Sequence, residues 1–309
     1  MYKKSIFFGF YKGLGDFISD SYIIEHFYKN DYKVYISIAS WLENLAKFIF
    51  PKANIISYKT GKDLLNIDYN SKYIFLSPNY LHPININYKS LILYFIKYKA
   101  VRKNLPKDTI IIKPSNWELI NYYLNLKKTY LNKHFYYMSY ELIKKYFPDV
   151  PDTYKECNQK IDNINKKPIN KIFIFPFSGF KPKDYPLENY YKIANFIKEK
   201  YKITPTFFVV PSDKEKLKEF ENQFNVESKS LVELTKIFNK NTLVICSDSG
   251  PGHLAARFGA NLIVLYSTTN PEKYKPIGSG KILTIKEKKA KDISYKKIIE
   301  IIENNFVLG

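Results

Sequence analysis

The feature of this chain that most restricts its fold is the alternation of short apolar runs with longer amphipathic stretches. The runs at residues 5–10, 33–39 and 73–78 are continuous stretches of β-branched and aromatic residues, without the in–out alternation of a strand that faces water on one side. Such strands belong to parallel sheets that are covered on both faces. Amphipathic helices are expected after the first two runs, at 16–28 and 41–50. The pattern therefore predicts an α/β protein.

The alternation pauses at a polar stretch with several prolines, PDVPDTYKECNQKIDNINKKPIN, and then begins again. A chain of 309 residues is long enough for two cores of about 150 residues each. We therefore expect two doubly wound α/β domains, at 1–150 and 171–309, joined by a linker at 151–170. The expected strands of the second half are 171–178, 204–211, 242–248, 261–267 and 281–287. Its expected helices are 187–201, 214–224, 230–240, 252–259 and 295–306. In the first half, a further helix is expected at 88–104.

Charge limits the choice of partners without deciding it. Lys and Arg number 49 against 29 Asp and Glu, which gives a formal net charge of +20. This balance favours anionic partners such as nucleic acid, phospholipid surfaces or phosphorylated sugars. The lysines form no long block, and the chain is generally rich in Lys, Asn, Ile and Tyr. A compositional origin of the charge is therefore the alternative interpretation.

Cysteine content and hydropathy favour a cytoplasmic protein. Cys157 and Cys246 lie far apart without a metal-ligand spacing, so neither a disulfide nor a zinc site is predicted. The apolar run near the N-terminus is too short for a signal peptide, and no run approaches the ~18 residues of a membrane span. Contact with a membrane is expected only at its surface.

The stretch SDSGPGHLA joins a predicted strand to a predicted helix. Asp248 ends the strand, Ser249 and Gly250 form the turn, and the helix is expected to begin near Pro251, whose missing N–H costs nothing at that position. Glycines permit a close approach of the backbone to a ligand, and the free N–H groups of a helix start attract anions. The junction therefore predicts a phosphate site. The alternatives are an N-capping role for Ser249 and a structural role for a half-buried His253.

Neighbouring strand ends carry similar residues. The next strand ends in YSTTNP, which places Ser267, Thr268 and Thr269 beside the same edge of the sheet. The first strand of the second half leads into FPFSGFKPKDYP, where Ser178 and Gly179 form a turn and Lys183 can reach phosphate oxygens. A solvated surface lysine is the alternative interpretation of Lys183. The loop VVPSDKEKL offers two acceptors for a ribose hydroxyl, Glu215 and Asp213, with helix-start acidity as their alternative role.

The N-terminal stretch FYKGLGDFISDSY follows the first predicted strand. Its G-x-G lacks the third glycine of the dinucleotide fingerprint, and no acidic residue ends a strand about 20 residues later, so a nicotinamide site is not supported. Asp16 can be a helix N-cap, or a general base whose pKa is raised by partial burial in a cleft. Asp20, one helical turn later, is the alternative base.

Together these residues resemble glycosyltransferase family 9, the ADP-heptose:lipopolysaccharide heptosyltransferases of bacteria. The resemblance covers about 171–277 and rests on D-[ST]-G-x-x-H-[LI]-A-A, followed by a strand that ends in small residues and a proline. In the first half it is limited to the surroundings of Gly15 and Asp16. The sequence departs from the family pattern at Tyr22, where a proline is expected, and at Ser267, where a glycine is expected.

The resemblance implies a GT-B fold, with two Rossmann-like domains facing a central cleft. It also implies inverting, metal-independent transfer without a cofactor, in which the N-terminal domain binds the acceptor and the C-terminal domain binds the nucleotide sugar. Asp16 would remove the acceptor proton, and Lys183 with helix N–H groups would hold the charge of the leaving group. With the loop residues described above, the predicted donor site comprises Ser178, Gly179, Glu215, Asp248, Ser249, Gly250, His253 and Thr269.

The leading hypothesis is a cytoplasmic glycosyltransferase that moves a sugar, by resemblance a heptose from ADP-heptose, onto a lipopolysaccharide or lipooligosaccharide core. The acceptor would be a glycolipid at the inner face of the cytoplasmic membrane, where the basic surface could dock peripherally. An alternative keeps the fold but uses another nucleotide sugar for a capsule or glycoprotein. A third hypothesis is a nucleic-acid binder, since aromatics among lysines can stack bases. No RNA-binding signature supports it, so no specific nucleic-acid partner is expected.

Overall fold

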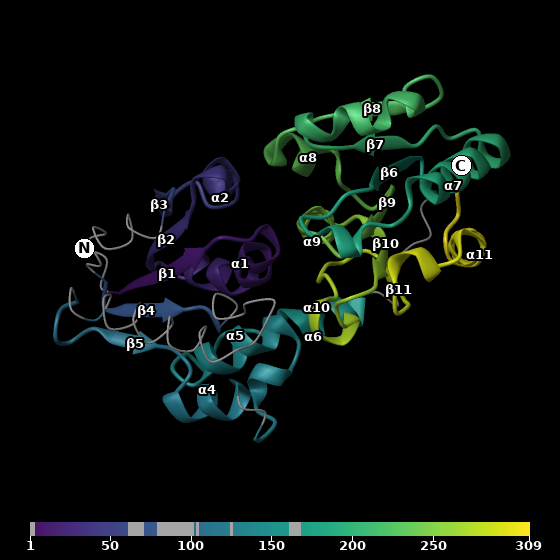
Figure 1. The fold of residues 1–309 in the computed structure, drawn as a ribbon. Helices are drawn as coiled ribbons and strands as arrows, with labels where there is room; N and C mark the ends of the chain where they lie inside the picture. The colour runs from purple at the N-terminus through teal and green to yellow at the C-terminus, as the bar shows by residue number, and fades with distance from the viewer. Residues whose placement is uncertain (1–3, 61–70, 79–101, 103–104, 124–125, 161–167) are drawn as a thin grey trace. The chain divides into compact units, whose positions relative to one another are not determined.

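The computed structural model describes residues 4–60, 71–78, 102, 105–123, 126–160 and 168–309. They form two compact units, Met1–Thr153 and Tyr154–Gly309, each built around a parallel β-sheet (Figure 1). The boundary falls within the stretch expected as a linker. The helix expected at 88–104 lies outside the described residues except for Arg102. Within the described ranges, none of the helices has the length and hydropathy that a bilayer crossing requires.

The first unit contains a five-stranded sheet in which all strands are parallel. Its strands are β1 (Ser5–Tyr11), β2 (Lys33–Ala39), β3 (Asn54–Tyr58), β4 (Tyr73–Leu76) and β5 (Ile110–Ile112), in the order β3-β2-β1-β4-β5. Its helices are η1 (Ser40–Leu42), α1 (Leu14–Lys29), α2 (Glu43–Ile49), α4 (Asn116–Tyr123), η4 (Tyr130–Asn132) and α5 (Phe135–Lys144). The ring of Phe8 in β1 packs against Phe27 of α1 and Phe75 of β4, which holds α1 on the sheet.

The central strand β1 is irregular where it approaches the first candidate loop. Its pairing with β2 shifts register between Phe8 and Tyr11, and Phe10 has a φ of 123°. A bulge of this kind bends a strand and redirects the chain that follows it, and a positive φ is strained for a bulky residue. The strain lies directly before the turn that leads into α1, and strained backbone often accompanies functional sites.

The second unit contains a six-stranded parallel sheet. Its strands are β6 (Lys171–Phe175), β7 (Thr206–Phe208), β8 (Asn225–Glu227), β9 (Thr242–Ser247), β10 (Asn261–Tyr266) and β11 (Ile282–Lys286), in the order β11-β10-β9-β6-β7-β8. Its helices are α6 (Thr153–Lys160), η6 (Lys181–Lys183), α7 (Leu187–Tyr201), η7 (Pro211–Phe220), α8 (Leu231–Ile237), α9 (Gly250–Arg257), α10 (Pro271–Tyr274), η8 (Ala290–Asp292) and α11 (Tyr295–Asn305).

The core of the second unit explains its order of strands. Every residue of β9 and β10 is buried, as expected for central strands that are covered on both faces. Apolar residues of α7 and α11 share one cluster with side chains of these strands, so both helices cover the same face of the sheet (Figure 1). Since all strands are parallel, the loops after β10, β9, β6 and β7 lie next to one another at one edge.

Among the elements of the second unit that differ from the sequence-based expectation are η7, β8 and α6. The α-helix expected at 214–224 is wrong, because η7 is a 3₁₀ segment that opens at a proline and is interrupted at Leu217 (φ −112°, ψ 16°). Strand β8 is not among the expected strands, since Asn-Val-Glu is not an apolar run. Helix α6 occupies part of the expected linker; its sequence TYKECNQK lacks the apolar periodicity that indicates a helix.

Helix α9 is held in place by a close approach of glycine backbone to its C-terminal end. A Cβ atom added to Gly278 would lie 2.0 Å from the carbonyl oxygen of Ala256, and one added to Gly280 would lie 2.1 Å from that of Ala260. The helix is followed by Gly259 with a φ of 84°, a left-handed conformation that favours glycine. The position of α9, and therefore of the loop before it, depends on these contacts.

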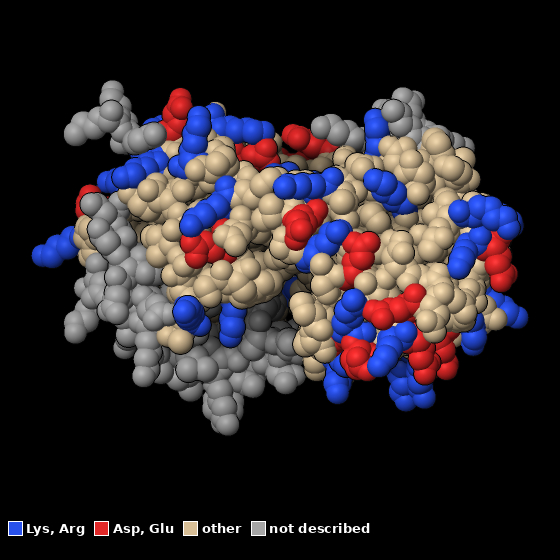
Figure 2. All heavy atoms as spheres, turned by 90° about the horizontal axis from the view of Figure 1, so that it is seen from above, with Lys and Arg blue, Asp and Glu red and all other residues tan. Residues whose placement is uncertain are grey.

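Acidic and basic side chains are mixed on the surface. Figure 2 shows Lys and Arg interspersed with Asp and Glu on the side that it presents. Within the described residues, charged side chains form local pairs, such as Lys47 with Glu43 at 2.6 Å and Lys133 with Glu141 at 2.7 Å. Exposed pairs of this kind contribute little to stability. On that side of the molecule, the basic excess is spread out and is not gathered into one patch.

Candidate active site

Asp248, directly after β9, is the centre of the densest group of predicted site residues. Its side chain is only 7% exposed. Its Oδ2 atom accepts hydrogen bonds from Lys183 Nζ at 2.7 Å and from Thr269 Oγ1 at 2.6 Å. The backbone N–H of Asp248 donates to the carbonyl of Leu265 at 3.0 Å. Both ends of this buried residue are therefore fixed, and its charge is compensated by charge-assisted hydrogen bonds.

Lys183 reaches Asp248 from the short turn η6 after β6. The turn is closed by Asp184, whose Oδ1 accepts from the backbone N–H of Ser178 at 2.7 Å. The Ser178 hydroxyl lies 2.8 Å from both this carboxylate oxygen and the carbonyl of Phe180, so it serves the turn itself. A Cβ added to Gly179 would meet none of the described atoms within 4 Å, which leaves this backbone open to a ligand. The Lys183 side chain remains 19% exposed.

The start of α9 lacks its usual cap. The helix begins at Gly250, one residue earlier than expected, and Ser249 occupies the N-cap position without a capping hydrogen bond from its side chain. Ser249 therefore has the N-cap position of the alternative interpretation, but its side chain makes no capping hydrogen bond. Its Oγ atom is buried and has no hydrogen-bond partner among the described residues. A buried hydroxyl in that state beside a helix N-terminus suits an anionic ligand.

His253 lies in the first turns of α9 and is buried. Its Nε2 atom is 3.9 Å from Asp248 Oδ1, too far for a hydrogen bond. Burial lowers the pKa of His253 to about 4, while the Asp248 carboxylate raises it and the Lys183 ammonium lowers it to smaller extents. The imidazole is therefore neutral near pH 7 and adds no positive charge to the group around Asp248.

The structure does not bring Glu215 into this group. Its side chain on η7 is 82% exposed and pairs with Lys218 at 3.4 Å. Asp213, the other predicted ribose acceptor, pairs with Lys216 at 2.5 Å. In the described part of the chain, no hydrogen bond connects Glu215 to Asp248 or Lys183. Its role as a ligand stays a prediction.

Two residues at this edge hold the turn that carries Lys183, and the sequence pattern did not predict these contacts. Asp184 closes the turn that carries Lys183, and its only sequence signal is an acidic residue shortly after a Ser-Gly turn. Ser267, which the sequence places at this edge without a specific contact, donates a hydrogen bond from Oγ to the carbonyl of Pro182 at 3.2 Å. The Ser267 contact joins two loops that follow different strands, and the Asp184 contact closes one loop on itself. Sequence spacing reveals neither contact.

The second candidate group lies in the first unit, where β1 leads into α1. Asp16 is the third residue of α1, and Gly13 holds the N-cap position, so the N-capping interpretation of Asp16 is wrong. A Cβ added to Gly13 would lie 2.8 Å from Asp16 Oδ2, which shows that the carboxylate folds back over the helix start. Burial raises the pKa of Asp16 to about 7, and the nearby charge of Asp20 contributes to this rise. This pKa suits a general base near neutral pH.

Asp20 lies one helical turn later and is fully buried, with 0% exposure. Its Oδ2 atom accepts a hydrogen bond from the Tyr11 hydroxyl at 3.0 Å. Burial and the charge of Asp20 raise the pKa of Tyr11 well above its ordinary value, so the tyrosine stays protonated and keeps donating. Of the two aspartates, only Asp16 is accessible to a substrate without rearrangement.

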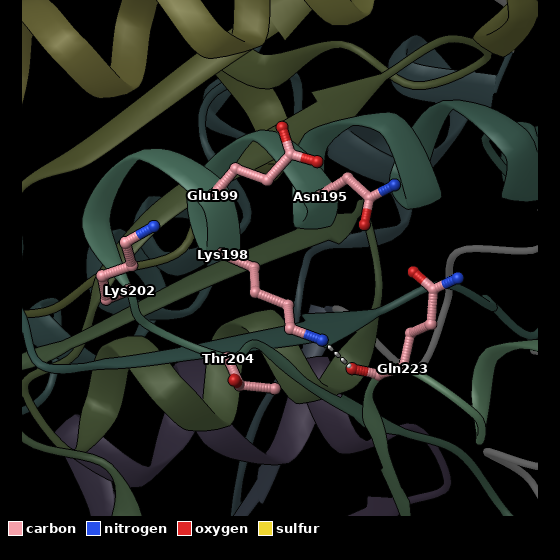
Figure 3. A pocket seen from close by; sticks show the side chains of 6 residues that line it. All are labelled: Asn195, Lys198, Glu199, Lys202, Thr204 and Gln223. Atoms are coloured by element: carbon pink, nitrogen blue, oxygen red, sulfur yellow. Dashed lines mark hydrogen bonds between the residues drawn. The ribbon is translucent and has the colours of Figure 1, made fainter.

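A pocket of about 400 Å³ lies elsewhere in the second unit, at the end of α7 (Figure 3). The side chain of Lys198 crosses it and donates to the carbonyl of Gln223 at 2.9 Å. Since Thr204 precedes β7, the pocket lies at the amino ends of the strands, on the edge opposite Asp248. It contains none of the predicted site residues, and it is lined by Asn195, Lys198, Glu199, Lys202, Thr204 and Gln223.

The described residues hold no group of three or more His, Cys, Asp or Glu side chains placed to bind a metal ion. Independence from metals stays a prediction, because this finding concerns the protein and not the nucleotide that would bind.

The fold of this chain is similar to the folds of solved glycosyltransferases. A glycosyltransferase family 9 protein of Veillonella parvula aligns with a TM-score of 0.65 and 18% identity, over 98% of this chain and 98% of that one. The E. coli heptosyltransferase WaaC with ADP aligns with a TM-score of 0.70 and 13% identity, over 97% of this chain and 99% of that one. At these identities the likeness concerns the fold alone, and it confirms the GT-B class.

The family follows from the amino-acid sequence itself. The profile of glycosyltransferase family 9 (heptosyltransferase) matches residues 123–302, more than half of the chain. The chain belongs to this family and is a glycosyltransferase. It is also 33% identical over 134 residues to the lipopolysaccharide core heptosyltransferase OpsX of Haemophilus influenzae. That match spans 40% of this chain and 37% of the relative.

Proposed function

We propose that this enzyme transfers a heptose from a nucleoside diphosphate heptose, such as ADP-heptose, to a lipopolysaccharide core by an inverting reaction without a metal. The names of its relatives support the substrate class: one is described as a lipopolysaccharide core heptosyltransferase, and another was solved with ADP. The observation that carries the proposal is the anion-binding arrangement around Asp248, in which an uncapped helix start, a buried free hydroxyl and a lysine lie on adjacent strand ends.

The donor diphosphate would bind at the start of α9. An ammonium has three N–H donors, and Asp248 accepts one from Lys183, so the others can meet phosphate oxygens. In the free enzyme, Asp248 cancels most of the charge of Lys183. The attraction of the diphosphate to this site therefore depends more on where the N–H and O–H donors point than on net charge. The Ser249 hydroxyl and the first N–H groups of α9 supply further donors, and the helix dipole favours the anion.

The acceptor hydroxyl would be activated by Asp16. As its oxygen forms a bond to the anomeric carbon, the bond from that carbon to the diphosphate oxygen breaks, and the hydroxyl proton passes to the Asp16 carboxylate. A single displacement inverts the configuration at the carbon. Lys183 and the donors at α9 stabilise the negative charge that develops on the departing diphosphate. A base with a pKa of about 7 is matched to this step near neutral pH.

Calorimetric titration with nucleoside diphosphates tests the donor site. We expect ADP to bind the parent enzyme, and Lys183→Met to weaken ADP binding by roughly 10-fold or more, because a charge-assisted contact to phosphate is lost. Lys181→Met is the matched control, since Lys181 is an exposed lysine on the same turn. Equal affinities of Lys183→Met and the parent would remove Lys183 from the site. Tighter binding of UDP or GDP than of ADP would favour the alternative donor.

Three further features stay predictions for this chain. They are a cytoplasmic location with peripheral contact at the inner face of the membrane, the absence of a cofactor, and the absence of a specific nucleic-acid partner. The mixed charges in Figure 2 give no support to a dedicated basic patch on the side shown there.

A further inference from the structure

The loop between β10 and α10, residues 267–270, contacts both of the segments that determine where Lys183 lies. Ser267 Oγ donates to the carbonyl of Pro182 at 3.2 Å, and Thr269 Oγ1 donates to Asp248 Oδ2 at 2.6 Å. We propose that this β10–α10 loop positions the Lys183 ammonium for the donor diphosphate, with Ser267 holding the lysine's backbone and Thr269 holding its carboxylate partner. This inference rests on the proposed function of Lys183.

Thr269 acts on the lysine through the carboxylate. The hydrogen bond from Asp248 N–H to Leu265 fixes the backbone of Asp248, but this bond alone does not set the orientation of its side chain. Thr269 and Lys183 both donate to the same oxygen, so the threonine hydroxyl fixes the point to which the ammonium is drawn. A lysine side chain has many rotamers, and it keeps one orientation only where such a partner is itself fixed.

The position of Thr269 is in turn fixed by a contact to its backbone. Its carbonyl oxygen accepts a hydrogen bond from Lys286 Nζ at 2.9 Å, which connects the loop to the end of β11. The hydroxyl of Thr269 is already donated to Asp248. We therefore assign to Thr269 a positioning role in place of the direct donor contact expected from the sequence.

Ser267 acts on the lysine through the main chain. It is buried at the end of β10. Its hydrogen bond joins the end of β10 to the residue directly before Lys183. Within η6 the N–H of Lys183 donates to the carbonyl of Phe180 at 2.9 Å, so the turn moves as one piece. In this chain Ser267 supplies an attachment for that turn.

Hydroxyl-specific variants test the proposal. Thr269→Val removes the hydroxyl and keeps the shape, and Thr269→Ser keeps the hydroxyl. We expect Thr269→Val to raise the Kd for ADP and the KM for the donor by roughly 3- to 10-fold, less than a direct hydrogen bond to a charged group contributes because the hydroxyl acts through the lysine, while Thr269→Ser stays within about twofold of the parent. Thr268→Val is the matched control, because Thr268 is the exposed neighbour. Ser267→Ala is expected to weaken ADP binding in the same direction, and it serves as the second variant should Thr269→Val fold poorly.

A double-mutant cycle separates positioning from general damage. If the hydroxyl acts through the lysine, Thr269→Val has no further effect on ADP affinity once Lys183→Met is present. The proposal is overturned if Thr269→Val costs the same in both backgrounds, if it binds ADP like the parent, or if Thr269→Ser is impaired as strongly as Thr269→Val. These outcomes leave the proposed function intact. The proposed donor site itself is contradicted by a different result, which is normal ADP binding by the Lys183→Met single variant.

Discussion

At the scale of single residues, Asp16 shows how local burial raises the pKa of a carboxylate toward the range that the proposed base needs. An aspartate in water is ionised far below neutral pH and is then a weak base. Burial at the start of α1, with the charge of Asp20 one turn away, raises the pKa of Asp16 to about 7. The buried Tyr11 hydroxyl meanwhile holds Asp20 in place. The two aspartates thus have separate tasks, one as the proposed base and one as a fixed charge.

The pH dependence of transfer follows from this arrangement. The base must be ionised to accept a proton, so kcat/KM is expected to rise as the pH increases through about 7 and to level off above it. Asp20→Asn removes the charge that raises the pKa of Asp16, so the rise is expected to shift to lower pH. Initial rates across a pH series measure both effects. A rise that stays at the same pH in Asp20→Asn contradicts the role of that charge.

At the scale of elements, the start of α1 places the Asp16 carboxylate over the backbone of Gly13. An alanine there would put its Cβ 2.8 Å from Asp16 Oδ2, so the side chain has to move, although the backbone of Gly13 (φ −99°, ψ 142°) accepts any residue. We expect Gly13→Ala to lower kcat by roughly 10-fold, within the range that a positioned base contributes, while the melting temperature and ADP affinity stay unchanged. Steady-state kinetics with thermal melting measure this separation. Unchanged kcat would show that the carboxylate position is not critical.

The packing of Gly278 against α9 predicts a loss of stability on substitution, unlike the substitution of Gly13. Its added Cβ would meet backbone, the carbonyl oxygen of Ala256 at 2.0 Å, and backbone in a core helix cannot move aside. Gly278→Ala is expected to lower the free energy of unfolding by about 2–3 kcal/mol, as overpacking does. Gly179→Ala is the stability control, since its Cβ meets none of the described atoms within 4 Å. Urea denaturation of the two variants checks the difference, and equal midpoints would contradict it.

At the scale of the whole molecule, the strand pattern was predictable because the sequences of buried parallel strands are continuous apolar runs. The expected ranges 33–39 and 187–201 agree with β2 and α7 to the residue. The polar α6 and the three-residue β8 were missed, since tertiary contacts stabilise them without an apolar repeat in the sequence. The family and the GT-B class were confirmed because the motif residues are contiguous in the chain.

The site was only partly predictable, because its contacts join distant segments. Because the carboxyl ends of parallel strands meet at one edge of a sheet, the sequence correctly predicted that Asp248, Lys183 and Thr269 lie there together. It did not indicate that Thr269 would donate to Asp248 or that Ser267 would hold the turn before Lys183. Such details depend on loop conformation and on which side-chain atoms come within hydrogen-bond distance, and sequence spacing carries no information at that level of detail.

One oxygen atom, Asp248 Oδ2, is shared by residues that follow three adjacent strands: β6 through Lys183, β9 through Asp248 itself and β10 through Thr269. A slip of any one of these strands by a single position would turn its side chains to the other face and take its residue away from this shared contact. Nucleotide affinity is thereby coupled to the alignment of the innermost strands, and binding would fail before the sheet itself came apart.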